Sequence, residues 1–205
     1  MDLYHIGIRL RGFSKSFFKI QKAKTDNREE KYVPHITLLR PFYTSDENKL
    51  IDIFNKTLSQ YNEPILFKIT DFNYFDNQKK IIHGTIEKNQ EIENIIHSLE
   101  GNLEKTIRFK HPKAGKEINL HTTISEEDNL SIMKELYNKI LPIDQYLLRT
   151  YLLKNKLILR EYDFYLNQSL TREEAKDKEI FRETIESFKT KTGLMPTPKE
   201  FRHIQ

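Results

Sequence analysis

A repeated spacing of histidine and threonine is the feature of this sequence that could most directly carry chemistry. In three places a histidine stands two positions before a threonine, and the three pairs are His35 and Thr37, His83 and Thr85, and His121 and Thr123. Each pair lies in a stretch expected to form a β-strand, where residues two apart point to the same side. One such strand therefore presents an imidazole and a hydroxyl group next to each other.

Two of these strands facing each other across a cleft would suit the cleavage of a phosphodiester. A neutral histidine can take a proton from water or from a sugar hydroxyl, while a protonated histidine gives a proton to the leaving oxygen. The threonine hydroxyls can hold the non-bridging phosphate oxygens by hydrogen bonds. An ordinary histidine pKa of about 6.5 allows one neutral and one charged ring near neutral pH. This chemistry needs no metal, and we expect no cofactor.

Each histidine–threonine pair taken alone is weak support, because a single histidine in a strand is most often structural or exposed. His35 and His121 carry more weight, since each lies near the start of a strand, beside apolar residues, in corresponding halves of the chain. A zinc site built from three strand histidines is an alternative. However, no further histidine or carboxylate lies at close ligand spacing around any of them.

Composition excludes several other classes of protein. Lys and Arg total 34 against 30 Asp and Glu, so the net charge is +4 and a polyanionic partner is allowed but not required. The absence of Cys excludes disulfides, thiolate zinc sites and iron–sulfur clusters. The six glycines are too scattered for a phosphate-binding glycine loop. No apolar run is long enough to cross a bilayer and no signal peptide is evident, so we expect a cytoplasmic protein.

Hydrophobic periodicity divides the chain into alternating strands and helices. Up to residue 166 their order is β-α-β-α-β-β-α-β-α-β-β, which falls into two similar halves and indicates an α+β fold. We expect strands at 3–11, 33–42, 64–69, 80–87, 118–125, 145–153 and 156–166, and helices at 14–24, 47–61, 90–109 and 126–140. The last two strands would be joined by a turn at Lys154 and Asn155.

The residues after 168 differ from the rest of the chain. A helix start signal at 169–174 predicts a helix that runs to about Thr192 and ends at Gly193. We expect this helix to dock on the main domain, with an oligomer contact or a partly mobile lid as alternatives. Residues 194–205 are expected to form an irregular terminus.

The two favoured motifs together resemble a known family. Residues 33–42, which read Val-Pro-His-Ile-Thr-Leu-Leu-Arg-Pro-Phe, and residues 120–124, which read Leu-His-Thr-Thr-Ile, look like the motifs of the two-histidine (2H) phosphoesterase superfamily. The most similar branch is the 2′-5′ RNA ligase / RNA 2′,3′-cyclic phosphodiesterase family. The first motif is a specific match, and the second is shorter. The resemblance covers residues 1–167 and leaves the C-terminal segment outside.

This resemblance implies a bilobal fold, in which two antiparallel sheets line a central cleft and helices lie outside. It implies a domain over residues 1–168, followed by a C-terminal helix and tail over 169–205. By position, His35 and His121 would be catalytic, and Thr37 and Thr123 would bind the substrate phosphate. We expect His121 to act as the base and His35 as the acid, with the reverse still open.

The resemblance also bears on substrates and on the third motif. It implies a metal-independent enzyme that opens 2′,3′-cyclic phosphates to 2′-phosphates, or that makes or cuts 2′-5′ linkages in RNA. His83 lies where such proteins have a plain strand, so we expect it to have no role in the reaction. An RNA- or nucleotide-binding module with little turnover is the alternative, and an interaction protein that uses its C-terminal helix is another. The natural substrate and the oligomeric state stay open, with a monomer favoured.

Four further residues are possible substrate contacts. Phe42 or Tyr43, just after the first motif, could stack on a base or could instead lie in the core or at its rim. Arg149 and Tyr151 share one face of a strand and could reach a phosphate, with a surface position as the alternative for Arg149. A basic stretch at 110–116 could follow an RNA backbone or could simply be solvated.

Overall fold

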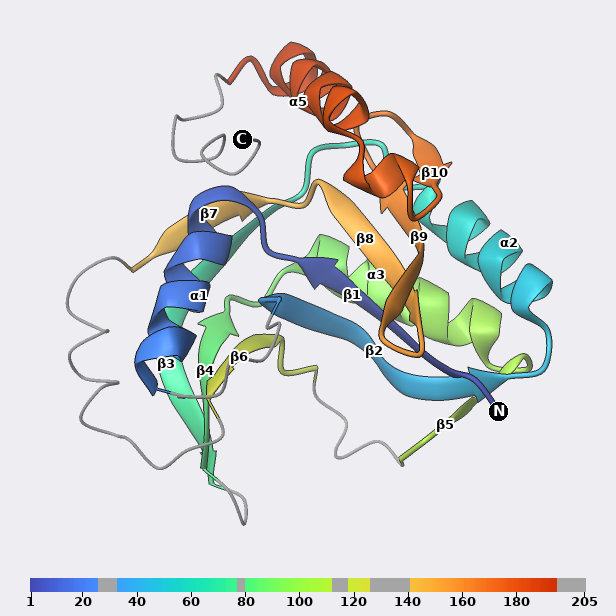
Figure 1. Ribbon diagram of the computed structural model, residues 1–205, viewed down its shortest axis with the longest axis horizontal. Helices are drawn as coiled ribbons and strands as arrows, with labels where there is room; N and C mark the ends of the chain where they lie inside the picture. The colour runs from blue at the N-terminus through green and yellow to red at the C-terminus, as the bar shows by residue number, and fades with distance from the viewer. Residues whose placement is uncertain (26–32, 77–79, 112–117, 126–140, 195–205) are drawn as a thin grey trace.

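The computed structural model describes residues 1–25, 33–76, 80–111, 118–125 and 141–194 (Figure 1). These residues form two antiparallel sheets with helices packed against them. The predicted helix at 126–140, most of the basic stretch at 110–116 and the terminus from 195 lie outside the described residues. No helix within the described ranges is long and apolar enough to cross a membrane.

The larger sheet has six strands, and alternation along them separates one side packed on helices from a second side that is only partly covered. Their order is β10 (Gln168–Leu170), β9 (Leu157–Asp163), β8 (Arg149–Lys154), β1 (Leu3–Arg9), β2 (His35–Thr44) and β5 (Ile107–Phe109). Tyr4, Ile6 and Ile8 alternate on the buried side of β1. That side faces helices α2 (Glu47–Leu58) and α3 (Gln90–Leu103), and the Tyr4 hydroxyl donates to Glu47 at 2.7 Å. The other side, which carries His5 and Arg9, is left for a site.

The smaller sheet has four strands and is covered on one side by helix α1 (Gly12–Thr25). Their order is β6 (His121–Ser125), β4 (Lys80–Ile86), β3 (Leu66–Asp76) and β7 (Ile143–Tyr146). The Phe18 ring lies against Gly84 so closely that a Cβ there would come within 2.8 Å of it. Gly84 thus allows the close approach of α1, and Phe17 packs at 6.0 Å from Phe72 on the same side. The opposite side of this sheet carries His83 and His121.

The two sheets meet where β2 of one contacts β6 of the other. The first motif begins β2 and the third begins β6, so each sheet contributes one histidine–threonine pair to the junction (Figure 1). The predicted α+β fold with two antiparallel sheets and helices outside is therefore confirmed.

Two predicted elements are wrong. The single strand at 145–153 is instead β7 in the smaller sheet and β8 in the larger one. Between them Leu147 donates its backbone N–H to Ile65, which ends the first pairing before the second begins. The helix at 90–109 ends at Leu103, and 107–109 forms the edge strand β5. Local periodicity cannot show either change, because both depend on pairing with distant strands.

The turn between β8 and β9 and the C-terminal segment are described in detail. Asn155 and Lys156 both have positive φ, at 49° and 68°, as a two-residue hairpin turn requires. The predicted helix from 169 begins only at residue 178, because 168–170 pair with β9 and 174–176 form a short 3₁₀ helix, η1. Helix α5 (Lys178–Thr192) ends at Gly193 as predicted, with φ of 68°. The domain boundary at 168 stays a prediction, and β10 crosses it.

Candidate active site

The first motif presents His35 with one ring nitrogen anchored and the other available. Its Nδ1 lies 2.9 Å from the carbonyl oxygen of Val33. A carbonyl oxygen can only accept, so Nδ1 must carry the hydrogen and donate it. The ring is thereby held in one orientation, and Nε2 is the atom left for chemistry.

The other two motifs repeat this local geometry. Nδ1 of His121 lies 2.9 Å from the carbonyl oxygen of Asn119, again two residues earlier in the chain. Nδ1 of His83 makes the same contact with Ile81 at 3.4 Å. The repetition shows that a histidine in these strands reaches back to the carbonyl two positions before it and presents Nε2 outward. The three motifs are therefore alike in local structure, and their surroundings distinguish them.

His35 belongs to a cluster on the partly covered side of the larger sheet. His5 lies beside it, with ring centroids 5.6 Å apart, and Nε2 of His5 is 3.2 Å from the hydroxyl oxygen of Thr37. Tyr151, predicted as a possible substrate contact, packs edge-on against both rings, at 5.6 Å from His5 and 6.3 Å from His35. Sequence reasoning missed His5, although its place on the side of β1 opposite Tyr4 and Ile6 was a signal for it.

Gly7 explains how Tyr151 reaches this cluster. Gly7 pairs with both Thr37 and Tyr151 in the sheet. A Cβ at Gly7 would lie 2.5 Å from the Tyr151 hydroxyl and from the carbonyl oxygen of Ile36. The strand therefore needs a residue without a side chain here, so that the tyrosine can lie across it.

Burial keeps the histidines of this cluster neutral. It lowers the pKa of His5 to about 4, and the neighbouring His35 adds to the shift. Burial also lowers the pKa of His35, with a smaller contribution from His121, while the hydrogen bond to Val33 opposes the shift. The first and third motifs lie on β2 and β6, the two strands in contact between the sheets. Near neutral pH a neutral His35 is suited to accept a proton.

The smaller sheet contributes a second cluster around His121. Its ring lies 4.8 Å from Phe75 and 5.3 Å from His83, and Phe75 stacks on His83 at 4.0 Å. His83 and Thr123 are opposite each other in the sheet, as are Thr85 and His121. The second and third motifs therefore form one square of two histidines and two threonines.

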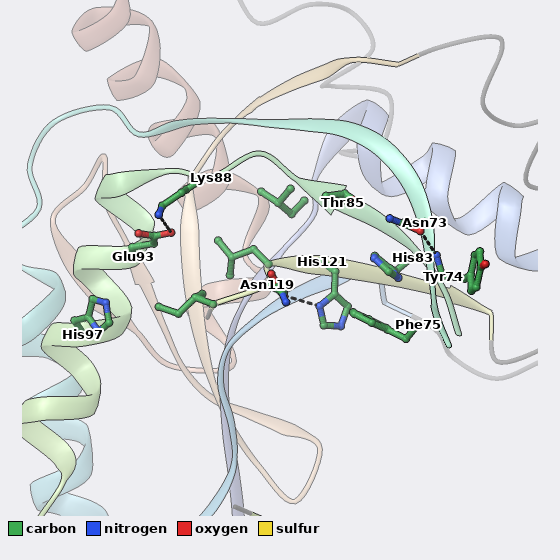
Figure 2. A pocket seen from close by; sticks show the side chains of 13 residues that line it. Asn73, Tyr74, Phe75, His83, Thr85, Lys88, Glu93, His97, Asn119 and His121 are labelled. Atoms are coloured by element: carbon green, nitrogen blue, oxygen red, sulfur yellow. Dashed lines mark hydrogen bonds and ion pairs between the residues drawn. The ribbon is translucent and has the colours of Figure 1, made fainter. Parts of the chain in front are cut away.

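A pocket of about 680 Å³ opens beside this square (Figure 2). His121, His83 and Thr85 line its wall, and Lys88 and His97 lie at the end next to α3. His83 lies in its wall although only 6% of its surface is exposed. The expectation that His83 lies in a plain strand thus misses its place next to His121.

Two predicted substrate contacts on β2 lie away from these clusters. Phe42 is fully buried, stacked on Tyr4 and edge-on to Phe109, so it is a core residue and cannot stack on a base. Tyr43 lies at the far end of β2, eight residues and roughly 25 Å of strand from His35. It pairs with β5 and its ring contacts Arg108. The placement of Tyr43 does not support stacking at the site.

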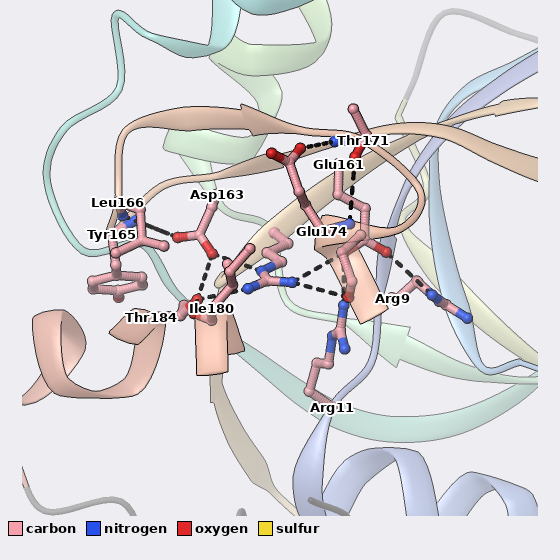
Figure 3. A network of polar contacts seen from close by, with 12 residues as sticks. Arg9, Arg11, Glu161, Asp163, Tyr165, Leu166, Thr171, Glu174, Ile180 and Thr184 are labelled. Carbon is pink, nitrogen blue, oxygen red and sulfur yellow. Dashed lines mark hydrogen bonds and ion pairs between the residues drawn. The ribbon is translucent and has the colours of Figure 1, made fainter. Parts of the chain in front are cut away.

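Arg149 is neither a phosphate ligand nor a surface residue. Only 2% of it is exposed, and its guanidinium donates to Asp163 at 2.6 Å and to Thr184 of α5 at 2.7 Å (Figure 3). Glu161 lies 3.6 Å from it and also binds Arg11 at 2.8 Å. We call Arg149, Asp163, Thr184 and Glu161 the Arg149 cluster. Buried charges must be paired, so this arginine is used in fixing α5 to the sheet.

The described residues contain no group of three or more His, Cys, Asp or Glu side chains placed to hold a metal ion. Thr37 and Thr123 lie on the same strands and sides as His35 and His121, as the spacing predicts. The structure thus brings together His35, Thr37 and Tyr151 from one sheet and His121 and Thr123 from the other. It adds His5 and His83 to them.

The chain is similar to known proteins at the level of a family model and of solved structures. The family model of the 2′-5′ RNA ligase superfamily matches residues 10–156, which is more than half of the chain. A search of curated proteins finds no match. Among solved structures, the chain is similar to Kluyveromyces marxianus Usb1 in complex with uridine monophosphate, at 9% identity. That match covers 83% of this chain and 98% of the other, with a TM-score of 0.44.

Proposed function

Because the chain belongs to the 2′-5′ RNA ligase superfamily, we propose that it is a phosphoesterase acting on RNA or nucleotide ends. Its reaction would be hydrolysis of a 2′,3′-cyclic phosphate to a 2′-phosphate, or the making or cutting of a 2′-5′ linkage. Two histidines would perform general acid–base catalysis without needing a metal. The substrate would be an RNA or nucleotide that carries one of these groups.

One observation carries this proposal. His35 and His121 come from different sheets, and each has Nδ1 bonded to a backbone carbonyl at 2.9 Å. Both therefore offer Nε2 to the junction of β2 and β6, where a phosphate could lie between them. Binding alone does not need two such groups, whereas proton transfer on both sides of a phosphorus does.

Burial favours one assignment of roles. The pKa of His35 is lowered, so its Nε2 is free to accept a proton from the attacking water. His121 would then donate a proton to the 3′ oxygen as its bond to phosphorus breaks, which leaves a 3′ hydroxyl and a 2′-phosphate. This reverses the assignment of His121 as base that we expected from the sequence.

The threonines and His5 would complete the site. The hydroxyls of Thr37 and Thr123 lie beside the two histidines and would donate to the non-bridging oxygens, where negative charge increases in the transition state. The bond from His5 to Thr37, at 3.2 Å, would hold one of these hydroxyls in place. Tyr151, packed against both His5 and His35, would fix the two rings.

The test is hydrolysis of an RNA oligonucleotide that ends in a 2′,3′-cyclic phosphate, run in EDTA, with the product phosphate position determined. His35→Ala and His121→Ala should each lower kcat about 10²–10⁴-fold, the range for losing a proton-transfer group. His111→Ala, an exposed histidine that does not line the pocket, is the matched control.

Three outcomes would count against parts of the proposal. A 3′-phosphate product would contradict the assigned leaving group. No turnover of this RNA or of a 2′-5′-linked dinucleotide would favour a nucleotide-binding module. Activity that EDTA abolishes would overturn the metal-independent mechanism.

A further inference from the structure

The second histidine–threonine pair is not used by the proposed reaction, yet it is built like the other two. His83 presents Nε2 in the same way as His121, and both line the pocket. Thr85 lies opposite His121 in the sheet, and its hydroxyl oxygen is buried with no hydrogen-bond partner within the described part of the chain. A buried hydroxyl without a partner at the wall of a pocket needs an explanation.

A second buried acceptor lies next to this hydroxyl. Asp71 is directly opposite Thr85 on β3, just after an irregularity in the pairing that follows Ile69. Its Oδ1 is buried and likewise has no hydrogen-bond partner among the residues described. Irregularities of this kind re-aim side chains and are frequent next to functional sites. Two unpartnered oxygens therefore lie together one residue pair from His83.

The polar groups around His83 favour a neutral donor over a second phosphate. Burial lowers the pKa of His83, and its Nδ1 hydrogen is engaged by Ile81, so Nε2 is an acceptor. Asp71 adds an acceptor that would repel an anion. The ammonium of Lys88 is 4.0 Å from Glu93, which offsets its charge. The volume, about 680 Å³, is in the range of pockets that hold a small organic group.

We propose that His83 and Thr85 form a nucleobase subsite next to His121, which selects bases that carry an exocyclic amine. This inference rests on the proposed function, since it assigns the base attached to the phosphate between His35 and His121. Cytosine and uracil test it, because cytosine has an amine donor at the position where uracil has a carbonyl acceptor. Phe75, stacked on His83, fixes the plane of the accepting ring.

The experiment compares RNA oligonucleotides that end in cytidine or uridine 2′,3′-cyclic phosphate. The wild type should prefer cytidine by about 10- to 100-fold in kcat/KM, the effect of leaving a buried acceptor unpaired. His83→Phe should lower the rate for cytidine to about that for uridine, and Thr85→Val should lower both rates, since a hydroxyl can accept from the amine or donate to the carbonyl. The phenylalanine keeps a ring against Phe75 and removes the acceptor. Thr122→Val, on the same strand as His121 but facing α1 beside Gly84, is the matched control.

Two kinetic results would overturn the inference. Equal wild-type rates for the two bases would mean that the pocket does not read the amine. An equal fall for both bases in His83→Phe would show that His83 supports the reaction instead of selecting the base.

Direct binding separates the inference from the proposed function. Calorimetry should show CMP binding more tightly than UMP, and His83→Phe should abolish the difference. If the wild type has no turnover but this binding difference is present, the subsite stands and the proposed reaction falls. If turnover is normal and CMP and UMP bind equally, the reverse holds.

Discussion

Two polar clusters occupy the same side of the six-stranded sheet, and they differ in whether their hydrogen bonds are complete. In the Arg149 cluster the charged groups of Arg149, Asp163 and Glu161 are all paired, and Thr184 ties them to α5 (Figure 3). At the histidine site, the hydrogen bond of His35 within the described residues is made by Nδ1, which leaves Nε2 for a substrate. Buried polar groups that are paired hold the fold together, whereas unpaired groups that face a cleft are available to a substrate.

The largest effect should be a loss of stability when the Arg149 cluster is disrupted. Arg149→Ala leaves the carboxylates of Asp163 and Glu161 buried without their shared partner, so we expect the free energy of unfolding to fall by about 3–5 kcal/mol. Chemical denaturation measures this. Arg182→Ala, which removes an exposed ion pair with Glu179 on α5, should cost less than about 1 kcal/mol and is the control. Similar losses for the two variants would contradict a structural role for the Arg149 cluster.

Substitutions at the histidine site should lower the catalytic rate and hardly change the stability of the fold. Thr37→Val removes a hydroxyl that would donate to the phosphate, so we expect kcat to fall about 10²-fold, as for the loss of one transition-state donor. The melting temperature should change little. Thr150→Val, in a neighbouring strand on the helix-covered side, should leave kcat unchanged. A large fall in stability with normal kcat for Thr37→Val would place Thr37 with the structural residues.

The sequence predicted well which strand residues are buried on one side of a sheet. It could not show whether the polar residues on the other side face solvent or a cleft. Alternation along β1 showed that Tyr4, Ile6 and Ile8 are buried, and they are. The same alternation leaves His5 on the polar side, which in a sequence can mean either solvent or a cleft. Only the pairing of β1 between β2 and β8 brings His5 to Thr37 and Tyr151.

Arg149 was misjudged for the same reason. Its partners Asp163 and Thr184 are 14 and 35 residues away in the chain, and one of them lies in the C-terminal helix. A lone arginine in a strand carries no sign of such partners, so exposure or a ligand role was the natural expectation. The motif histidines were easier, because their anchor is a backbone carbonyl two residues earlier and needs no distant partner.

The burial of His5 as a neutral ring should make the stability of the fold depend on pH. Its folded pKa of about 4 lies below the ordinary value of about 6.5, so the unfolded chain binds more protons between these pH values. Stability should therefore fall as the pH drops from about 6.5 towards 4, by on the order of 2–3 kcal/mol. His5→Gln, which keeps a hydrogen-bonding group for Thr37, should flatten this part of the curve. Parallel curves for the two proteins would show that His5 is not buried as a neutral ring.

The pH dependence of activity depends on the other histidine of this cluster. If His35 is the base, it must be neutral to accept a proton, so kcat/KM should fall only as the pH drops through its lowered pKa. The acid limb of the profile should then lie below 6.5, the ordinary histidine value, and a pH–rate series on the cyclic phosphate measures it. An acid limb above that value would contradict the assignment of His35 as the base.

The smallest effect should be a change in the free energy of unfolding when buried hydroxyls that face no pocket are removed. Thr122 and Thr150 are fully buried, and neither hydroxyl has a hydrogen-bond partner within the described residues. Both lie on helix-covered sides, next to α1 and opposite Ile8 respectively, where no substrate can reach.

Thr→Val at either position removes a buried polar atom without changing the shape of the side chain. We expect each to raise the free energy of unfolding by about 1 kcal/mol, or the melting temperature by about 2–4 °C. Thr85→Val should give a similar gain in stability while lowering the rate for both bases. A destabilised Thr122→Val or Thr150→Val would mean that these hydroxyls are satisfied by bound water, and the same measurement on Thr85→Val would then show whether its oxygen is reserved for a substrate.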